Sequence, residues 1–380
     1  MTSPCPLGYR RPSRRVPPAR KAPALLQPDL APPVSHLPVV DVAVADLPIA
    51  DPGVLRARVT RVDRSAYDAL AEGSGALLRV AAPRPTTDPH DAPTVGDWVD
   101  VIEGPLGWGT VAVLPRTSLL VRGTASGRSA AQPLAANIDT VLVCAGLSSK
   151  LPLRRIERLL TLAWESGATP VVLLTKADLC DDLDDAVRQV LPHAPGVDVV
   201  TVSAASRDLA SLDPYVGPGV TLVLLGASGA GKSTVVNGLA GSQVMATGNA
   251  RQVDGKGRHT TTHRELITLP SGAVIIDTPG LRGVALNGGG EEGLAKAFAD
   301  VEELATACRF ADCGHQTEPG CAITASVEAG DLGQDRVDSW RKLEREMAFQ
   351  ARRTDLRLRA EAKARGRSLS KQQRAQGYRP

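Results

Sequence analysis

Residues 226–233 have the types and the spacing of a phosphate-binding loop. They read GASGAGKS, which fits the Walker A pattern GxxxxGK[ST], between an apolar strand-like run and a helix-forming segment. Glycines in this segment let the backbone curl so that N–H groups point at phosphate oxygens, while Lys232 would reach the β- and γ-phosphates and Ser233 would ligate Mg²⁺. A flexible turn is the alternative, but the full match in this context favours phosphate binding. The candidate residues are Gly226, Ala227, Ser228, Gly229, Ala230, Gly231, Lys232, Ser233 and Thr234.

Three further segments could complete a guanine-nucleotide site, and each follows an apolar strand-like run. DTPG (277–280) would place Asp277 to act through the water shell of Mg²⁺ and the Gly280 N–H to meet a γ-phosphate. In TKAD (175–178), the Asp178 carboxylate can accept hydrogen bonds from N1–H and the 2-amino group of guanine. SAA (203–205) would support guanine O6 through backbone N–H groups. The candidate base-binding residues are Thr175, Lys176, Ala177, Asp178, Ser203 and Ala204, with Lys176 packed along the base plane.

TKAD alone is a weak signal, because such a tetrapeptide is often only a strand end and a helix cap. All four segments, however, come at carboxyl ends of strands, where open α/β sheets bind ligands. Their order is unusual, since the guanine-specificity segments precede the phosphate loop rather than follow it. The same sheet can form from a permuted chain whose usual termini are joined and whose chain is opened at another loop. The order therefore predicts a circular permutation.

Three cysteines and one histidine gather in a short C-terminal segment, as Cys308, Cys313, His315 and Cys321. Three thiolates and one imidazole are the ligand set of a closed, tetrahedral structural zinc site. In a chain with six cysteines and no export signal, this clustering favours a metal over a disulfide framework. Three buried cysteines with an incidental histidine are the alternative. We expect one structural Zn²⁺ that pins a loop-rich segment with little core of its own.

The elements around these motifs predict several domains. Short β-like runs between turn signals at residues 54–62, 76–82, 97–102 and 108–114 indicate an OB-type β-barrel, although another β-roll of equal size would give the same pattern. After residue 131, apolar strands alternate with helices, which indicates a doubly wound α/β domain. We expect a disordered basic arm at 1–35, a barrel at 36–130, a circularly permuted P-loop GTPase domain at 131–307, and a zinc-binding helical domain with an Arg-rich tail at 308–380.

Charge is distributed unevenly along the 380 residues, although the net formal charge is only +3. Residues 1–35 carry six basic side chains and one acidic (net +5), and residues 334–380 carry fourteen basic and six acidic (net +8), which leaves −10 for the middle. Basic ends on an acidic body indicate a polyanionic partner, with solvated tails as the alternative. The 3% of aromatic residues argue against sequence readout by base stacking. No apolar run approaches a membrane span, and prolines interrupt the N-terminus, so we expect a cytoplasmic protein with no membrane partner.

Together these motifs resemble the RsgA (YjeQ) family of circularly permuted GTPases. The resemblance covers residues 54–353 and includes VGDWV (95–99), LPRTSLLVR (114–122), AANID (135–139) and GRHTTT (257–262). It implies GTP hydrolysis stimulated by the small ribosomal subunit, binding to that subunit and its rRNA, and assistance in its late maturation. We expect the protein to act as a monomer.

GRHTTT lies where the first switch loop of a GTPase belongs, between the phosphate loop and DTPG. Thr260 or Thr261 would complete the Mg²⁺ shell, and His259 is the candidate catalytic residue that positions the attacking water. Two departures matter. Leu281 occupies the place where many small GTPases have a water-orienting Gln, so we expect slow intrinsic hydrolysis. Thr175 replaces the Asn found in many GTPases and loses its amide, which lowers the expected affinity for the base but leaves Asp178 to select guanine.

Two other functions remain open from the residues. An ATPase or small-molecule kinase would use the same phosphate loop, but Asp178 argues against it. A non-catalytic RNA-binding module, whose nucleotide site only switches conformation, fits the apolar Leu281. The chain also runs from DTPG directly into the Cys/His segment, so we expect movement at the second switch to reach the zinc-binding domain.

Overall fold

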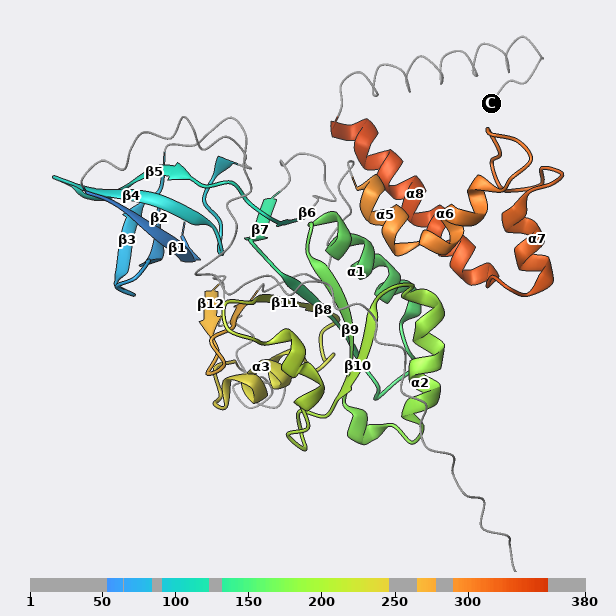
Figure 1. The fold of residues 1–380 in the computed structure, drawn as a ribbon, viewed down its shortest axis with the longest axis horizontal. Helices are drawn as coiled ribbons and strands as arrows, with labels where there is room; N and C mark the ends of the chain where they lie inside the picture. Colours follow the sequence, from blue (N-terminus) through green and yellow to red (C-terminus); the bar gives the residue numbers. More distant parts are fainter. Residues whose placement is uncertain are drawn as a thin grey trace, which may run out of the picture. The chain divides into compact units, whose positions relative to one another are not determined.

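A computed structural model of the chain describes residues 53–63, 65–83, 91–122, 132–245, 265–277 and 290–354 (Figure 1). The predicted basic arm, the GRHTTT segment with His259, Thr260 and Thr261, and Gly280 lie outside these ranges. Within them, no helix is both long and apolar enough to cross a membrane.

Five strands close into a barrel. In sheet order they run β1-β2-β3-β5-β4 and back to β1, and β3 with β5 is the parallel pair among antiparallel ones. This is the arrangement of an OB-type barrel, as predicted. Its interior is filled by small and medium side chains such as Ala57, Val59, Val80 and Val99, around the buried Tyr67. The strands are β1 (Val54–Val62), β2 (Ala66–Ala71), β3 (Leu77–Ala81), β4 (Trp98–Gly104) and β5 (Gly107–Val113).

The central domain is built on a mostly parallel sheet with the order β10-β9-β8-β11-β13-β12, in which β12 alone runs antiparallel. The inner strands are buried along nearly their whole length, as expected for parallel strands covered on both faces. The strands are β8 (Thr140–Gly146), β9 (Thr169–Thr175), β10 (Asp198–Val202), β11 (Thr221–Gly226), β12 (Glu265–Thr268) and β13 (Val274–Asp277).

Helices cover the two faces of this sheet, which makes the domain doubly wound (Figure 1). The helices α1 (Leu153–Glu165) and α2 (Leu183–Val190) share one hydrophobic cluster, and α3 (Lys232–Ala240) belongs to the other. The strand that carries the phosphate loop, β11, is central in the sheet but fourth along the chain among the six strands. The strands β9 and β10, which end at the TKAD and SAA segments, come before it, and β12 and β13 come after it, as the predicted permutation requires.

Among the described residues, four helices follow the central sheet: α5 (Glu291–Ala297), α6 (Ala299–Thr306), α7 (Ala322–Ala329) and α8 (Gln334–Thr354). Side chains of α5, α6 and α8, including Leu294, Val301 and Trp340, lie in the same hydrophobic cluster as Ile156 and Leu160 of α1. The C-terminal helices therefore share a core with the central domain.

The three family-like segments VGDWV, LPRTSLLVR and AANID meet where the barrel joins the central domain. Arg116, in the second segment, binds the fully buried Asp97 of the first through two hydrogen bonds of 2.7 Å. Asn137, in the third, donates to the Gly96 carbonyl (3.0 Å) and accepts from the Thr117 N–H (3.0 Å). A hairpin of β6 (Leu119–Arg122) and β7 (Gln132–Ala136) completes this joint.

Candidate functional site

The phosphate loop lies between β11 and α3, as the Walker A pattern requires. Gly231 is the N-cap of α3 with φ +80°, and Gly226 has φ +153°. A Cβ at position 226 would lie 2.5 Å from the Cys144 carbonyl oxygen, so this position requires glycine. Lys232 Nζ donates to the carbonyl oxygens of Gly226 (2.9 Å) and Ala227 (2.8 Å), so its ammonium group lies over the loop where phosphates would bind.

Thr175 joins the base-recognition loop to the phosphate loop. Its buried hydroxyl lies 2.8 Å from the Ala230 carbonyl oxygen and 3.4 Å from that of Ala145. A Cβ on Gly231 would approach the same hydroxyl to 3.0 Å, so the two loops are in direct contact. Many GTPases connect these two loops through an asparagine. Here the Thr175 hydroxyl connects them by donating to the Ala230 carbonyl.

Asp178 and Ser203 come together from the ends of two neighbouring strands, β9 and β10. The Ser203 hydroxyl donates to Asp178 Oδ1 at 2.5 Å and so orients the carboxylate. Lys176 adopts a left-handed conformation (φ 60°), and its Nζ lies 3.2 Å from the hydroxyl of Ser148. Ser148 belongs to no motif, and its role in holding Lys176 could not be found from the sequence.

Asp277 ends β13, the strand beside β11 in the sheet. The structure therefore places four predicted segments, or their described parts, at the carboxyl ends of strands in one sheet: SAA after β10, TKAD after β9, the phosphate loop after β11 and Asp277 at the end of β13, with β8 between β9 and β11. A hydroxyl at Ser233 and a carboxylate at Asp277 are the hard oxygen ligands that suit Mg²⁺. Gly280, His259, Thr260 and Thr261 lie outside the described residues, so their roles stay predictions.

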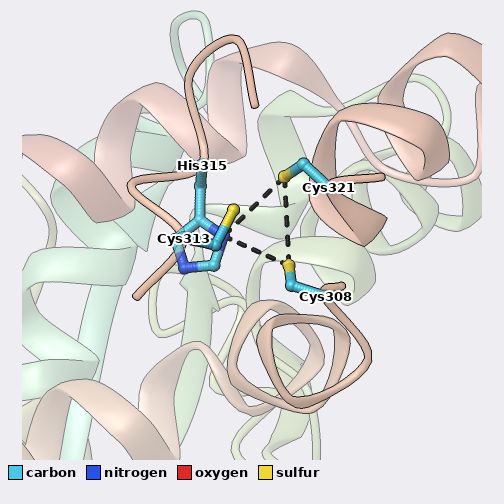
Figure 2. A group of neighbouring side chains, drawn as sticks. All are labelled: Cys308, Cys313, His315 and Cys321. Carbon is cyan, nitrogen blue, oxygen red and sulfur yellow. Dashed lines mark hydrogen bonds between the residues drawn. The ribbon is translucent and has the colours of Figure 1, made fainter. Parts of the chain in front are cut away.

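The four predicted zinc ligands converge in the C-terminal domain (Figure 2). His315 Nδ1 lies 3.4 Å from Cys308 Sγ and 3.7 Å from Cys321 Sγ, and these two sulfurs are 4.0 Å apart. All four ligand atoms, with that of Cys313, lie within 4.8 Å of one another. Zn–S bonds of about 2.3 Å in a tetrahedron imply an S···S separation of about 3.8 Å. The cluster has the dimensions of a tetrahedral zinc site.

Neighbouring groups favour the thiolate form of one ligand and hold the backbone of the loop between the ligands. Burial would raise the pKa of the Cys321 thiol, but Thr324, near the start of α7, together with His315 and Cys313, lowers it to about 6. A lowered thiol pKa favours the thiolate that binds metal. The Glu318 carboxylate accepts from the N–H groups of Gly314, Gln316 and Thr317, which closes the turn between the ligands.

Known proteins resemble this chain over most of its length. The family model described as RsgA GTPase matches residues 113–287. The Small ribosomal subunit biogenesis GTPase RsgA of Streptomyces avermitilis is 49% identical over 315 residues, covering 81% of this chain and 84% of that protein. The protein of the same name from Xanthomonas euvesicatoria is 45% identical over 313 residues, covering 81% and 85%.

Two solved structures share the fold. The crystal structure of YjeQ from Thermotoga maritima has a TM-score of 0.57 at 24% identity, covering 77% of this chain and 98% of that one. YloQ, described as a circularly permuted GTPase, has a TM-score of 0.56 at 24% identity, covering 78% and 96%.

Proposed function

The chain belongs to the RsgA GTPase family, and from this premise we propose that it hydrolyses GTP on the small ribosomal subunit and assists the late maturation of that subunit. The observation that carries the proposal is 49% identity to a small-subunit biogenesis GTPase over 81% of the chain. The barrel, the permuted GTPase domain and the Cys/His module accompany that similarity.

Hydrolysis of GTP requires positioning and electrostatic stabilisation more than covalent chemistry by the protein. The N–H groups of the phosphate loop and Lys232 would bind the β- and γ-phosphates. Ser233 and, through water, Asp277 would hold Mg²⁺, with Thr260 or Thr261 completing its shell; the ion supplies charge neutralisation on the transferring phosphate. We propose that Gly280 donates its N–H to the γ-phosphate and that His259 positions the attacking water.

Asp178 supports guanine over adenine as the base. The Ser203 hydroxyl donates to Oδ1 of this carboxylate at 2.5 Å, and the carboxylate would accept from both N1–H and the 2-amino group of guanine. Competition of GTP and ATP for a fluorescent GTP analogue tests this proposal. We expect GTP to displace the analogue and ATP to fail at equal concentration, whereas equal displacement would favour the ATPase or kinase alternative.

The Cys308, Cys313, His315 and Cys321 cluster supports one structural Zn²⁺ in this protein. Four protein ligands would fill a tetrahedral shell and leave no position for substrate, so the site's role would be to stabilise the fold. Mass spectrometry of the native protein should find one zinc ion per chain, and a native mass without metal would overturn the proposal.

The proposed partner is the small ribosomal subunit, with the basic ends of the chain contacting rRNA phosphates. Sedimentation of the protein with purified small subunits, in GDP and in a non-hydrolysable GTP analogue, tests the partner directly. We expect co-sedimentation with small subunits that is stronger in the GTP analogue and weakens as salt is raised. Equal binding to purified large subunits would contradict the proposal. A monomeric state and a cytoplasmic location stay predictions.

A further inference from the structure

His315 is the candidate zinc ligand with an unusual backbone conformation. It lies in the loop between α6 and α7, and its φ is +55°, in the left-handed region. A residue with a Cβ is strained there and stays there only when the surrounding structure holds it. Any change of these backbone angles would move the imidazole relative to the cysteines. The geometry of the metal site therefore depends on the contacts that hold His315.

The imidazole of His315 is directed at the sulfur atoms through one of its two nitrogens (Figure 2). Nδ1 lies 3.4 Å from Cys308 Sγ and 3.7 Å from Cys321 Sγ. A histidine that ligates a metal usually donates the N–H of its other ring nitrogen to a carboxylate or a carbonyl oxygen, and this hydrogen bond fixes the ring. Among the described residues, His315 Nε2 has no such partner. Other contacts must therefore orient the ring.

Two consecutive residues of α8 supply such contacts from outside the loop. Trp340 lies against the His315 ring in an edge-to-face arrangement, with 5.7 Å between the ring centres and 64° between the ring planes. Arg341 Nη2 donates a hydrogen bond to the His315 carbonyl oxygen. The first contact restrains the ring and the second restrains the backbone. Together they determine where Nδ1 points.

Trp340 is itself held firmly. Its side chain is 6% exposed and belongs to the hydrophobic cluster that α8 shares with α1. Its Nε1–H donates to Glu302 Oε1, on α6, at 3.1 Å. A buried indole whose N–H is bonded has little freedom to move. The imidazole therefore packs against a surface that is fixed by the core rather than by the loop.

Arg341 is not placed by an ion pair. Among the described residues its guanidinium group has no carboxylate partner, and its Nε is buried without a hydrogen bond. Leaving a buried donor unpaired costs free energy, so simple packing would favour an apolar side chain at this position. The bond to the His315 carbonyl is the contact that an apolar side chain could not make. This contact gives the arginine a role at the metal site.

We propose that Arg341 is a positioning residue of the zinc site. Acting with the Trp340 ring, it holds His315 in the left-handed conformation in which Nδ1 binds the ion. The four ligands alone form an incomplete site, and docking of α8 completes it. The inference rests on the structural Zn²⁺ proposed above and adds to it a helix that contains none of the four ligands.

Zinc affinity of the full chain, measured by competition with a chromophoric chelator, tests this role. Arg341→Met keeps a long side chain and removes the donor to His315. Loss of a group that orients a metal ligand typically costs 10- to 100-fold in affinity, so we expect zinc to bind at least about tenfold more weakly. Arg341→Lys keeps a donor and should recover most of the loss. Arg345→Met is the matched control, because exposed Arg345 bonds only to the Arg341 carbonyl among the described residues.

Thermal unfolding with and without zinc separates positioning from a general loss of packing. An ion that binds only the folded state raises the melting temperature by an amount that depends on its affinity. We therefore expect Arg341→Met to melt a few degrees below the wild type when both are loaded with zinc, and at the same temperature after zinc is removed. An equal loss in both states would make Arg341 a packing contact only and overturn the inference.

The nitrogen that binds the ion is measured by ¹⁵N NMR of the imidazole side chains, with the His315 signals assigned by their change when zinc is removed. We expect a metal-bound Nδ1 and a protonated Nε2 in the wild type. Binding through Nε2, or a zinc affinity of Arg341→Met equal to that of Arg345→Met, would contradict the inference. A wild-type chain whose native mass contains no zinc would instead reject the proposed zinc site itself.

Discussion

Thr175 shows how one substitution can preserve a connection while changing its chemistry. Its hydroxyl, 2.8 Å from the Ala230 carbonyl oxygen, joins the base loop to the phosphate loop. A threonine side chain carries a hydroxyl and no amide, so it lacks the group that an asparagine would offer to the purine. The loop connection is therefore retained, and in the proposed site recognition of the base would depend on Asp178, which accepts a hydrogen bond from Ser203.

Thr175→Val keeps the shape of the side chain and removes the hydroxyl. The buried Ala230 carbonyl then loses its donor, at a cost of about 1 kcal/mol, so we expect GTP affinity to fall about fivefold. Thr169→Val, at the exposed start of the same strand, is the matched control and should bind GTP as the wild type does. Titration with a fluorescent GTP analogue measures both, and equal affinities for the two variants would contradict the connection.

His259 is the second residue whose role can be isolated. If it positions the attacking water, His259→Ala should lower subunit-stimulated turnover by about 100-fold, the usual contribution of one such group, while GTP affinity changes little. Single-turnover hydrolysis with bound subunits gives the rate. An unchanged rate would eliminate the catalytic role.

The motif residues could be predicted from the sequence because they lie within a few residues of one another along the chain, so they must also lie close together in space. Phosphate-loop residues and zinc ligands lie close together along the chain, and both clusters form in the structure. Arg336 and Glu157, whose side chains lie 3.1 Å apart, could not be paired in this way, because they are 179 residues apart along the chain and neither belongs to a motif. Only the packing of α8 against α1 brings them together.

At the level of elements, the sequence predicted the apolar parallel strands. It did not predict the short strands β2, β6 and β7. The strands β8, β9 and β11 are continuous apolar runs, and they lie in the part of the chain where apolar strands alternating with helices were predicted. β2 (AYDALA) lacks β-branched residues and was missed, although its alternating burial completes the barrel. The β6–β7 hairpin was also missed, because its pairing depends on the joint with the barrel rather than on a local turn signal.

The joint between the barrel and the GTPase domain gives a sharp test of packing. Gly96 has φ +94°, and a Cβ there would lie 2.2 Å from the Ala136 carbonyl oxygen. Gly96→Ala should therefore lower the free energy of unfolding by at least about 2 kcal/mol, through backbone strain and the clash together.

Gly109→Ala is its control. A Cβ at position 109 would contact no atom within 4 Å, so we expect a change below about 1 kcal/mol. Urea denaturation of both variants gives the comparison. Equal unfolding free energies would show that the close approach of the VGDWV and AANID segments does not stabilise the joint.

On the scale of the whole molecule, the order of the motifs predicted a circular permutation, and the sheet has one. Because base recognition precedes the phosphate loop, the chain had to be opened after DTPG and joined between β10 and β11, and the sheet has that arrangement. The same opening sends the chain from Asp277 to α5 and on to the Cys/His cluster. What the sequence did not predict is the extent of the shared core, because burial of α5, α6 and α8 against α1 is a tertiary property.

The charge of the chain differs between the middle of the sequence and its two ends. The middle of the sequence, with a net charge of −10, contains the barrel and the nucleotide site, while both ends are basic. A polyanion would be attracted to the ends and repelled by the body, which orients binding without sequence readout. This distribution fits rRNA as the proposed partner.

The rate of GTP hydrolysis with and without purified small ribosomal subunits tests the central claim most directly. Leu281 in place of a water-orienting Gln predicts slow hydrolysis by the protein alone. We expect small subunits to raise the rate by tenfold or more, equivalent to about 1.4 kcal/mol of the activation free energy, and large subunits to have no effect. Lys232→Ala should abolish the stimulated rate. A rate that is the same with and without small subunits would contradict the account.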